Sequence, residues 1–356
     1  MICLSYISGI LSKERLFLTQ QNSMAYLTFL RWLGTLVVVI AHLCTGLYDF
    51  PPGIVDDSFM IFCRIIHDSF SWCIPIFIMI SGSLLLNKDK EITYRKIFVY
   101  IRRFLLALLL FGLFYNILKL VFLEKKVEAS QIGRALFALM KGEAWEHMWY
   151  LYMIPCLYLT IPIFKKYTDH SSTKEIQILL AVLFVPVSIS EVAQSVFHLP
   201  PSGFFLPPFT TFVFYMILGH YLHTARPKIN AMIPAAGLLL NIVLIVLTHA
   251  LIPEKNPWDW WMVDSPMTAF AGACVFLLAQ NVKKVPDFMQ KYSSFTFGIY
   301  LVHPFFLNIL FRQFGFFPKS FSSAYLFIPA FLFVSVFSVA LTYGLRLIKP
   351  LRKYVL

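Results

Sequence analysis

The sequence predicts an all-α fold, a polytopic membrane bundle of about ten transmembrane helices. Hydrophobic residues make up 59% of its 356 residues and charged residues only 13%, with a mean hydropathy of +0.73. This composition leaves too few charges to cover a soluble globule of that size. Long apolar stretches recur along the chain without the ten-residue alternating pattern of a membrane β-barrel. Helices are then the structure that satisfies the backbone inside hydrocarbon.

Each expected span has about the length that crosses a bilayer. The ten lie at residues 24–48, 66–86, 104–123, 148–164, 176–194, 204–222, 229–252, 264–282, 293–311 and 323–347. Within the second span, Pro75 predicts a kink, and Ser81-Gly82 predicts a place where another helix or a ligand comes close. We expect residues 1–23 to be an N-terminal tail, with Met24 as an alternative start, and residues 24–348 to be one ten-helix domain. Residues 349–356 are expected to form a short basic cytoplasmic tail.

The distribution of basic residues predicts the orientation. With the amino end in the cytoplasm, about 20 Lys or Arg fall in inner loops and tails and about 8 in outer loops, as the positive-inside rule requires, out of 30 in the chain. Both termini are therefore expected in the cytoplasm, and a bacterial inner (plasma) membrane fits best. The net charge of +12 is explained by orientation, so we expect no nucleic-acid partner.

The first span carries two ionisable residues, Arg31 and His42. Eleven helical steps amount to three turns plus about 20° and roughly 16 Å of rise, so both side chains project from one face. An arginine at the bilayer centre costs about 2.5–3.5 kcal/mol and usually faces protein or water. Taken singly, Arg31 could snorkel to the headgroups and His42 could bond a neighbouring helix. The pair on one face favours a functional site.

Other polar residues in or beside the spans divide into two groups. Snorkelling or interfacial solvation accounts for Lys119, His220 and His249, whereas Glu191 and His303 are candidates for a substrate pocket. The other basic candidates, Arg102 and Arg103, stand at the inner mouth of the third span, where guanidinium groups can bind phosphates. Trp149 is typical of an interfacial anchor.

No motif for a metal or a permanently bound cofactor is present. The six cysteines form no CxxC pair, and the sequence has neither a glycine-rich phosphate loop nor an HExxH motif. The apolar surroundings of the cysteines indicate that they serve as small core residues. Cys44, Cys63 and Cys73 fall near the same membrane face, and a disulfide among them is left open.

Several segments, in order, resemble the acyltransferase 3 family of integral-membrane acyltransferases. They are the Arg31 and His42 spacing, IPIFIMISGSLLL in the second span, the basic stretch into IRRF, HMWYLYMIPCLYL, LGHYL and FTFGIYLVHP. The pattern of spans two, four and nine looks closest to the enterobacterial common antigen O-acetyltransferase. The leading 23 residues depart from the family pattern.

The resemblance implies transfer of an acetyl or other short acyl group from acyl-CoA to a hydroxyl of a cell-surface or lipid-linked glycan. His42 matches the family histidine and Arg31 the arginine that acts with it. A neutral imidazole can take the hydroxyl proton, and arginine can hold phosphates or stabilise negative charge. Direct attack and an acyl-histidine intermediate both remain open, and we favour direct attack.

The remaining expected site residues belong to the two substrates. Arg102, Arg103 and Ser81 are expected to bind acyl-CoA, with the pantetheine arm reaching past Arg31 towards His42. The acceptor pocket is expected to include Trp149, Tyr300, His303 and Glu191.

Two other functions are compatible with the composition. A transporter or flippase of a lipid-linked saccharide would also use many helices, proline kinks and buried polar groups, although no inverted repeat is apparent in the sequence. A membrane scaffold without catalysis is disfavoured by the arginine and histidine on one face.

Overall fold

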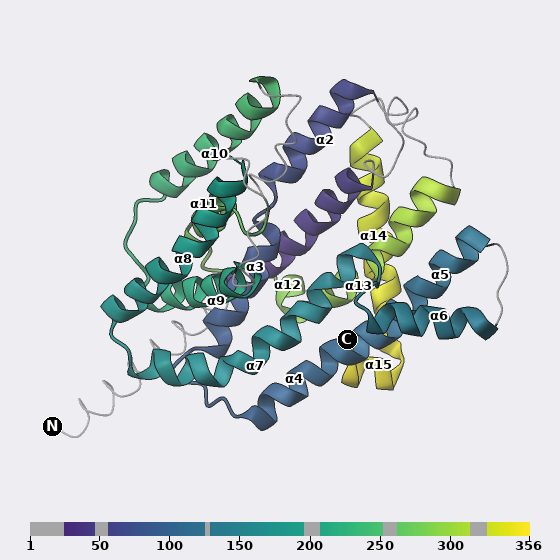
Figure 1. Ribbon diagram of the computed structural model, residues 1–356, viewed down its shortest axis with the longest axis horizontal. Helices are drawn as coiled ribbons and strands as arrows, with labels where there is room; N and C mark the ends of the chain where they lie inside the picture. Colours follow the sequence, from purple (N-terminus) through teal and green to yellow (C-terminus); the bar gives the residue numbers. More distant parts are fainter. Residues whose placement is uncertain (1–24, 47–55, 125–128, 196–206, 252–261, 314–325) are drawn as a thin grey trace.

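The structure is a computed structural model that describes residues 25–46, 56–124, 129–195, 207–251, 262–313 and 326–356. Over these ranges the chain is helical and no strand occurs, which confirms the all-α prediction (Figure 1). The first described helix, Ala25–Thr45, has no label in Figure 1 and is drawn in purple. The labelled α-helices are α2 (Asp57–Ser69), α3 (Cys73–Leu85), α4 (Tyr94–Ala107), α5 (Leu113–Glu124), α6 (Ala129–Met140), α7 (Trp149–His170), α8 (Thr173–Ser195), α9 (Pro207–Ala225), α10 (Met232–Leu251), α11 (Pro266–Ala279), α12 (Asp287–Lys291), α13 (Phe295–Asn308), α14 (Phe327–Leu347) and α15 (Lys349–Tyr354).

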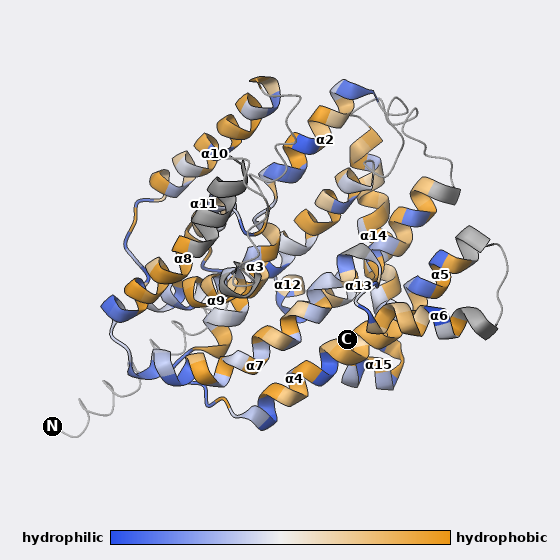
Figure 2. Cartoon of the chain, viewed as in Figure 1, coloured by the Kyte–Doolittle hydropathy of each residue, from blue (hydrophilic) through white to orange (hydrophobic). Residues whose placement is uncertain are grey.

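Several helices are suited to a membrane by length and composition. In the described part of the chain five are long and apolar enough to cross one, namely Ala25–Thr45, Asp57–Leu85, Tyr94–Leu120, Met232–Leu251 and Phe327–Leu347. Pro266–Ala279 and Phe295–Phe311 are apolar but shorter. The count of ten spans and the cytoplasmic placement of both termini stay predictions. Figure 2 shows apolar residues along α10 and α4, and hydrophilic residues where α7 ends.

Helices also form in segments that were expected to be loops. α2 begins at Asp57 because Asp56 caps it, accepting from the backbone N–H of Ser58 at 2.8 Å. α4 begins at Tyr94 after the Thr93 cap, so the basic segment before the expected third span is helical. α6 lies between the third and fourth expected spans, where no helix was expected, and the tail after residue 348 contains the short helix α15.

A break between α2 and α3 replaces the kink expected at Pro75. The chain turns at residues 70–72, and α3 starts at Cys73. Pro75 therefore lies in the first turn of α3, where backbone N–H groups have no intrahelical partner and a missing one costs little. In contrast, Pro304 lies inside α13, and a π-helical turn, Ile309–Gln313, follows that helix.

Two hydrophobic core clusters share the Ala25–Thr45 helix. The first includes Leu27 and Val38 together with buried residues of α3, α9 and α11. The second includes Val39 and Leu43 together with buried residues of α13 and α14. In Figure 1 the purple helix accordingly runs through the middle of the molecule. Its tilt and rotation are thus fixed from both sides.

The crossing of α3 and α9 depends on two glycines. A Cβ atom on Gly82 would stand 1.9 Å from the main-chain oxygen of Met216, and one on Gly219 would stand 2.1 Å from that of Met79. Ser83 lies at the same crossing and donates to the carbonyl oxygen of Gly219 at 2.9 Å. Small residues permit this backbone approach, as expected for Ser81-Gly82.

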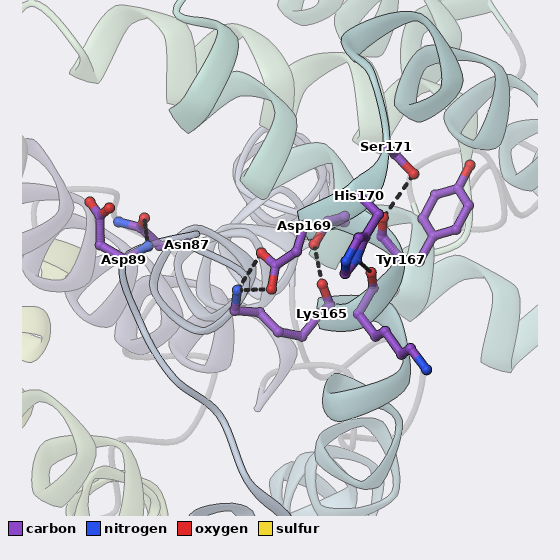
Figure 3. A network of polar contacts seen from close by, with 9 residues as sticks. Asn87, Asp89, Lys165, Tyr167, Asp169, His170 and Ser171 are labelled. Carbon is purple, nitrogen blue, oxygen red and sulfur yellow. Dashed lines mark hydrogen bonds and ion pairs between the residues drawn. The ribbon is translucent and has the colours of Figure 1, made fainter.

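The end of α7 carries a cluster of polar contacts (Figure 3). Lys165 is buried and pairs with Asp169 one turn later. His170 and Ser171 bond backbone carbonyl groups of the last turn, the oxygens of Lys166 and Tyr167 respectively, each at 2.8 Å. The buried charge of Lys165 is therefore neutralised within its own helix.

Candidate active site

A cavity of about 430 Å³ lies against the Ala25–Thr45 helix. Its wall comes from that helix, α3, the segment before α4, α4, α7 and the region around the start of α13. This volume falls within the range of small-molecule sites. Of the residues predicted for the site from sequence, six line the cavity: Arg31, His42, Ser81, Arg103, Trp149 and Tyr300.

His42 presents one ring nitrogen for chemistry. Its Nδ1 lies 2.9 Å from the carbonyl oxygen of Val38, one turn earlier in the same helix. A carbonyl oxygen only accepts, so Nδ1 must carry a hydrogen and, in the neutral ring, Nε2 keeps its lone pair. The side chain is half-buried and lines the cavity. This arrangement suits a general base.

The cavity is electropositive. Arg31, Lys90 and Arg103 line it, while no carboxylate appears among its described lining residues. Arg31 shares its helix with His42, as the eleven-residue spacing predicts, and both reach the same cavity. Lys90 also lies over the ring of Tyr100, 5.8 Å from its centroid. Cations without nearby acids favour an anionic ligand, and guanidinium groups suit phosphates in particular.

The two adjacent arginines have different surroundings. Arg103 is half-buried, lies 5.4 Å from the ring centroid of Phe297, and donates through Nε to the carbonyl oxygen of Val355 at 2.9 Å. Arg102 is exposed and lies 5.5 Å from the ring centroid of Tyr354, outside the cavity lining. The structure therefore brings Arg103 to the site and leaves Arg102 outside it.

Ser81 connects the cavity wall to α7. Its hydroxyl lies 3.1 Å from the Tyr158 hydroxyl and donates to the carbonyl oxygen of Phe77 at 3.0 Å. Tyr158 itself lines the cavity and packs edge-on against Phe104. The expected contact of Ser81 with a ligand stays a prediction, because these bonds also explain the residue as a helix-to-helix link.

Aromatic residues form another part of the wall. Trp149 lines the cavity with 39% of its surface exposed and packs against Phe212 at 5.9 Å between ring centroids. Tyr300 lines the cavity and donates its hydroxyl to the carbonyl oxygen of His147. Glu191 belongs to α8, but its side chain lies outside the described residues. Trp149 and Tyr300 thus add aromatic surface to the cavity wall.

A cluster of three imidazoles surrounds the end of the cavity at His42. The ring centroid of His303 lies 4.9 Å from that of His42, and His147 lies 6.2 Å from His42 and 5.7 Å from His303. His303 is fully buried, does not line the cavity, and has its Nδ1 bonded to the carbonyl oxygen of Tyr300 at 2.8 Å. It contacts the His42 ring but is not part of the cavity wall.

Sequence reasoning did not assign a role to His147. The residue stands in the polar segment before α7, in the 3₁₀ turn Glu146–Met148, where no helical period shows which way a side chain points. Its neighbour Trp149 was expected to anchor at the membrane interface, which would have placed His147 in solvent. The structure instead buries His147 beside His42. Lys90, which also lines the cavity, was likewise not among the predicted site residues.

The apolar helices thus enclose a cavity lined by cationic residues and histidines, as in a membrane protein with a polar site inside its helix bundle. The chain belongs to the acyltransferase 3 family, because the model described as an acyltransferase domain matches residues 24–347. The protein is therefore a membrane acyltransferase. The narrower resemblance to the enterobacterial common antigen enzyme stays a prediction.

Relatives with one and the same name come from two Staphylococcus species. The chain is 22% identical over 300 residues to the "Probable poly-beta-1,6-N-acetyl-D-glucosamine export protein" of Staphylococcus aureus strain Mu50, covering 80% of this chain and 83% of the relative. It is 24% identical over 305 residues to the protein of the same name from Staphylococcus epidermidis, covering 80% and 81%. No solved structure matches the chain significantly.

Proposed function

We propose that this protein moves an acetyl or other short acyl group from acyl-CoA to a hydroxyl of a cell-surface or lipid-linked glycan, as a multi-pass protein of the bacterial inner membrane. One observation carries the proposal. His42 shares a single cavity with Arg31, Lys90 and Arg103, and no described carboxylate lines that cavity. Such a site offers a base in His42 and cationic side chains that can bind phosphates.

The chemistry follows from the free nitrogen of His42. Nε2 takes the proton of the acceptor hydroxyl while the hydroxyl oxygen forms a bond to the carbonyl carbon of the thioester. The carbon–sulfur bond then breaks, and the imidazolium returns the proton to the leaving thiolate. Arg31, which remains cationic, stabilises the negative charge or holds a donor phosphate. This direct route needs only one base, while an acyl-histidine intermediate stays the alternative.

The two substrates approach different parts of the wall. Arg103 and Lys90 would bind the phosphates of CoA, so that the pantetheine arm extends past Arg31 to His42. Trp149 and Tyr300 would pack against the acceptor sugar, because aromatic faces bind the apolar faces of sugar rings and Trp149 is partly exposed. The named polysaccharide of the relatives supports a glycan acceptor.

The test is acyl transfer by the purified full chain in detergent. Radiolabelled acetyl-CoA is supplied with β-1,6-linked N-acetylglucosamine oligosaccharides or with a bacterial lipid extract. We expect label in a glycan ester, and none with His42→Ala. His170→Ala is the matched control, because its Nδ1 also bonds the carbonyl one turn earlier but the residue is exposed on α7. Undiminished transfer by His42→Ala would reject its catalytic role.

The second candidate function is export of a saccharide, which the name of the staphylococcal relatives favours. Proteoliposomes separate the two functions. A transporter moves a fluorescent lipid-linked saccharide across the bilayer without acyl-CoA. The saccharide stays chemically unchanged with the wild type and with His42→Ala alike. An acyltransferase instead esterifies the saccharide when acyl-CoA is supplied, whether or not the saccharide crosses the bilayer.

A further inference from the structure

His147 is a buried imidazole whose ring nitrogens have no hydrogen-bond partner in the described part of the chain. Only 4% of the residue is exposed, and neither Nδ1 nor Nε2 forms a hydrogen bond within the described part of the chain. A buried polar group left unpaired costs about 1–3 kcal/mol. Such groups in native structures require an explanation, and this one lines the cavity that contains His42.

Several polar groups around His147 bond other residues, and Nε2 of the neighbouring His303 also has no hydrogen-bond partner among the described residues. The hydroxyl of Tyr115, whose ring lies 5.2 Å away, donates to the carbonyl oxygen of Leu301 at 2.9 Å. The hydroxyl of Tyr300 donates to the main-chain oxygen of His147, which fixes the backbone and leaves the ring free. His303 uses its Nδ1 for a backbone carbonyl. None of these neighbours bonds the ring of His147, so a ligand in the cavity is left as its partner.

The spacing between the two rings suits a reacting group. The centroids of His42 and His147 lie 6.2 Å apart, and the rings meet edge to face at 85°. Both residues line the same cavity, so a hydroxyl oxygen there, about 2.8 Å from Nε2 of His42, can attack a carbonyl carbon that lies in the cavity beside both rings. The oxygen of that carbonyl then points towards His147, where an oxyanion needs a donor at about 2.7–3.1 Å.

We propose that His147 is a second catalytic residue, whose ring N–H donates to the oxyanion that forms on the thioester carbonyl while His42 removes the acceptor proton. This assignment rests on the proposed function. A neutral imidazole can serve as such a donor. His147 keeps its own proton throughout: the hydroxyl proton goes to His42 and then to the thiolate.

The position also separates His147 from Arg31. Arg31 stands about three turns from His42 along the same helix, at roughly 16 Å of rise, whereas His147 is a ring neighbour of His42. The guanidinium of Arg31 is therefore better placed for the donor's phosphates or arm, and His147 for the reacting carbonyl. Arg31 then binds the acyl donor, and His147 donates the hydrogen bond to the oxyanion.

The experiment compares His147→Gln with His147→Met. The two side chains have similar length, but only glutamine carries an N–H donor. Acetyl-CoA turnover is measured as hydrolysis and as transfer to the β-1,6-linked N-acetylglucosamine oligosaccharide. We expect His147→Met to lower kcat by about 100- to 1,000-fold, the usual effect of removing an oxyanion donor, with little change in the KM for acetyl-CoA. His147→Gln should recover at least tenfold of that loss.

Two results would overturn the assignment. Equal kcat values for the two variants would show that the hydrogen-bond donor is irrelevant, and a raised KM with unchanged kcat would show a role in ground-state binding. The CoA-induced rise in melting temperature, measured for each variant, separates misfolding from lost catalysis. A wild-type chain that turns over no donor rejects the proposed function itself, whereas an active wild type with equal variants rejects only the role of His147.

Discussion

Arg102 and Arg103 provide a sharp test of the donor site, because they are sequence neighbours with different surroundings. Arg103 lines the cavity and Arg102 does not. Replacing Arg103 by alanine should therefore weaken CoA binding, whereas the same change at Arg102 should leave it nearly unaltered. The pair controls for the loss of one positive charge from α4.

The expected magnitude follows from the contact each arginine can make. A hydrogen bond to a charged group contributes about 1.5–3 kcal/mol, which corresponds to about a 10- to 150-fold increase in Kd. Arg103 is half-buried, so solvent screens it less than an exposed side chain. For exposed Arg102, screening by water and salt limits the expected change to less than about threefold.

The assay is isothermal titration of the purified chain with CoA and, separately, with pantetheine, which has no phosphates. Arg103→Ala should weaken CoA binding and leave pantetheine binding unchanged. Arg103 also bonds the carbonyl oxygen of Val355, and a general disturbance of the tail would weaken both ligands alike. Equal loss for the two ligands, or equal effects of the two arginine changes, would refute the phosphate role of Arg103.

Two further predictions concern stability, measured as melting temperature in detergent. Gly219→Ala should destabilise the fold by about 3 kcal/mol, because its Cβ would lie 2.1 Å from the main-chain oxygen of Met79. Gly133→Ala, with no atom within 4 Å of the new Cβ, should not destabilise it, and similar melting temperatures for the two would contradict the close crossing. Asp68→Asn should cost about 3 kcal/mol, because buried Asp68 bonds Nε2 of His249 at 2.8 Å and links α2 to α10; an unchanged melting temperature would show that this pair contributes nothing.

The sequence predicted the part of the site that lies on one regular helix. Arg31 and His42 are polar residues in an otherwise apolar segment, and a helix of fixed period determines that they share a face. The structure places both on the same cavity. Ser81-Gly82 was predictable for a similar reason, since small residues in an apolar helix indicate a close approach.

Other parts of the site depend on contacts that sequence does not contain. Consecutive helical residues point about 100° apart, so only the packing of α4 decides that Arg103 rather than Arg102 faces inward. His147 stands in a short turn without a period, and its burial results from the tyrosines and histidines of other helices. α6 was missed because its segment is too short and too polar for a span.

The shared helix of the two core clusters has a consequence for donor selection. Arg31 and His42 lie on one continuous helix that packs against a core cluster on each side, so the distance between them cannot adapt to the substrate. Under the proposed function, a thioester whose phosphates bind Arg103 and Lys90 would reach His42 only if its carrier arm is long enough to pass Arg31 along this helix. Acetyl groups on much shorter carriers, such as acetyl phosphate or a truncated thioester, would be anchored or reactive, but not both at once.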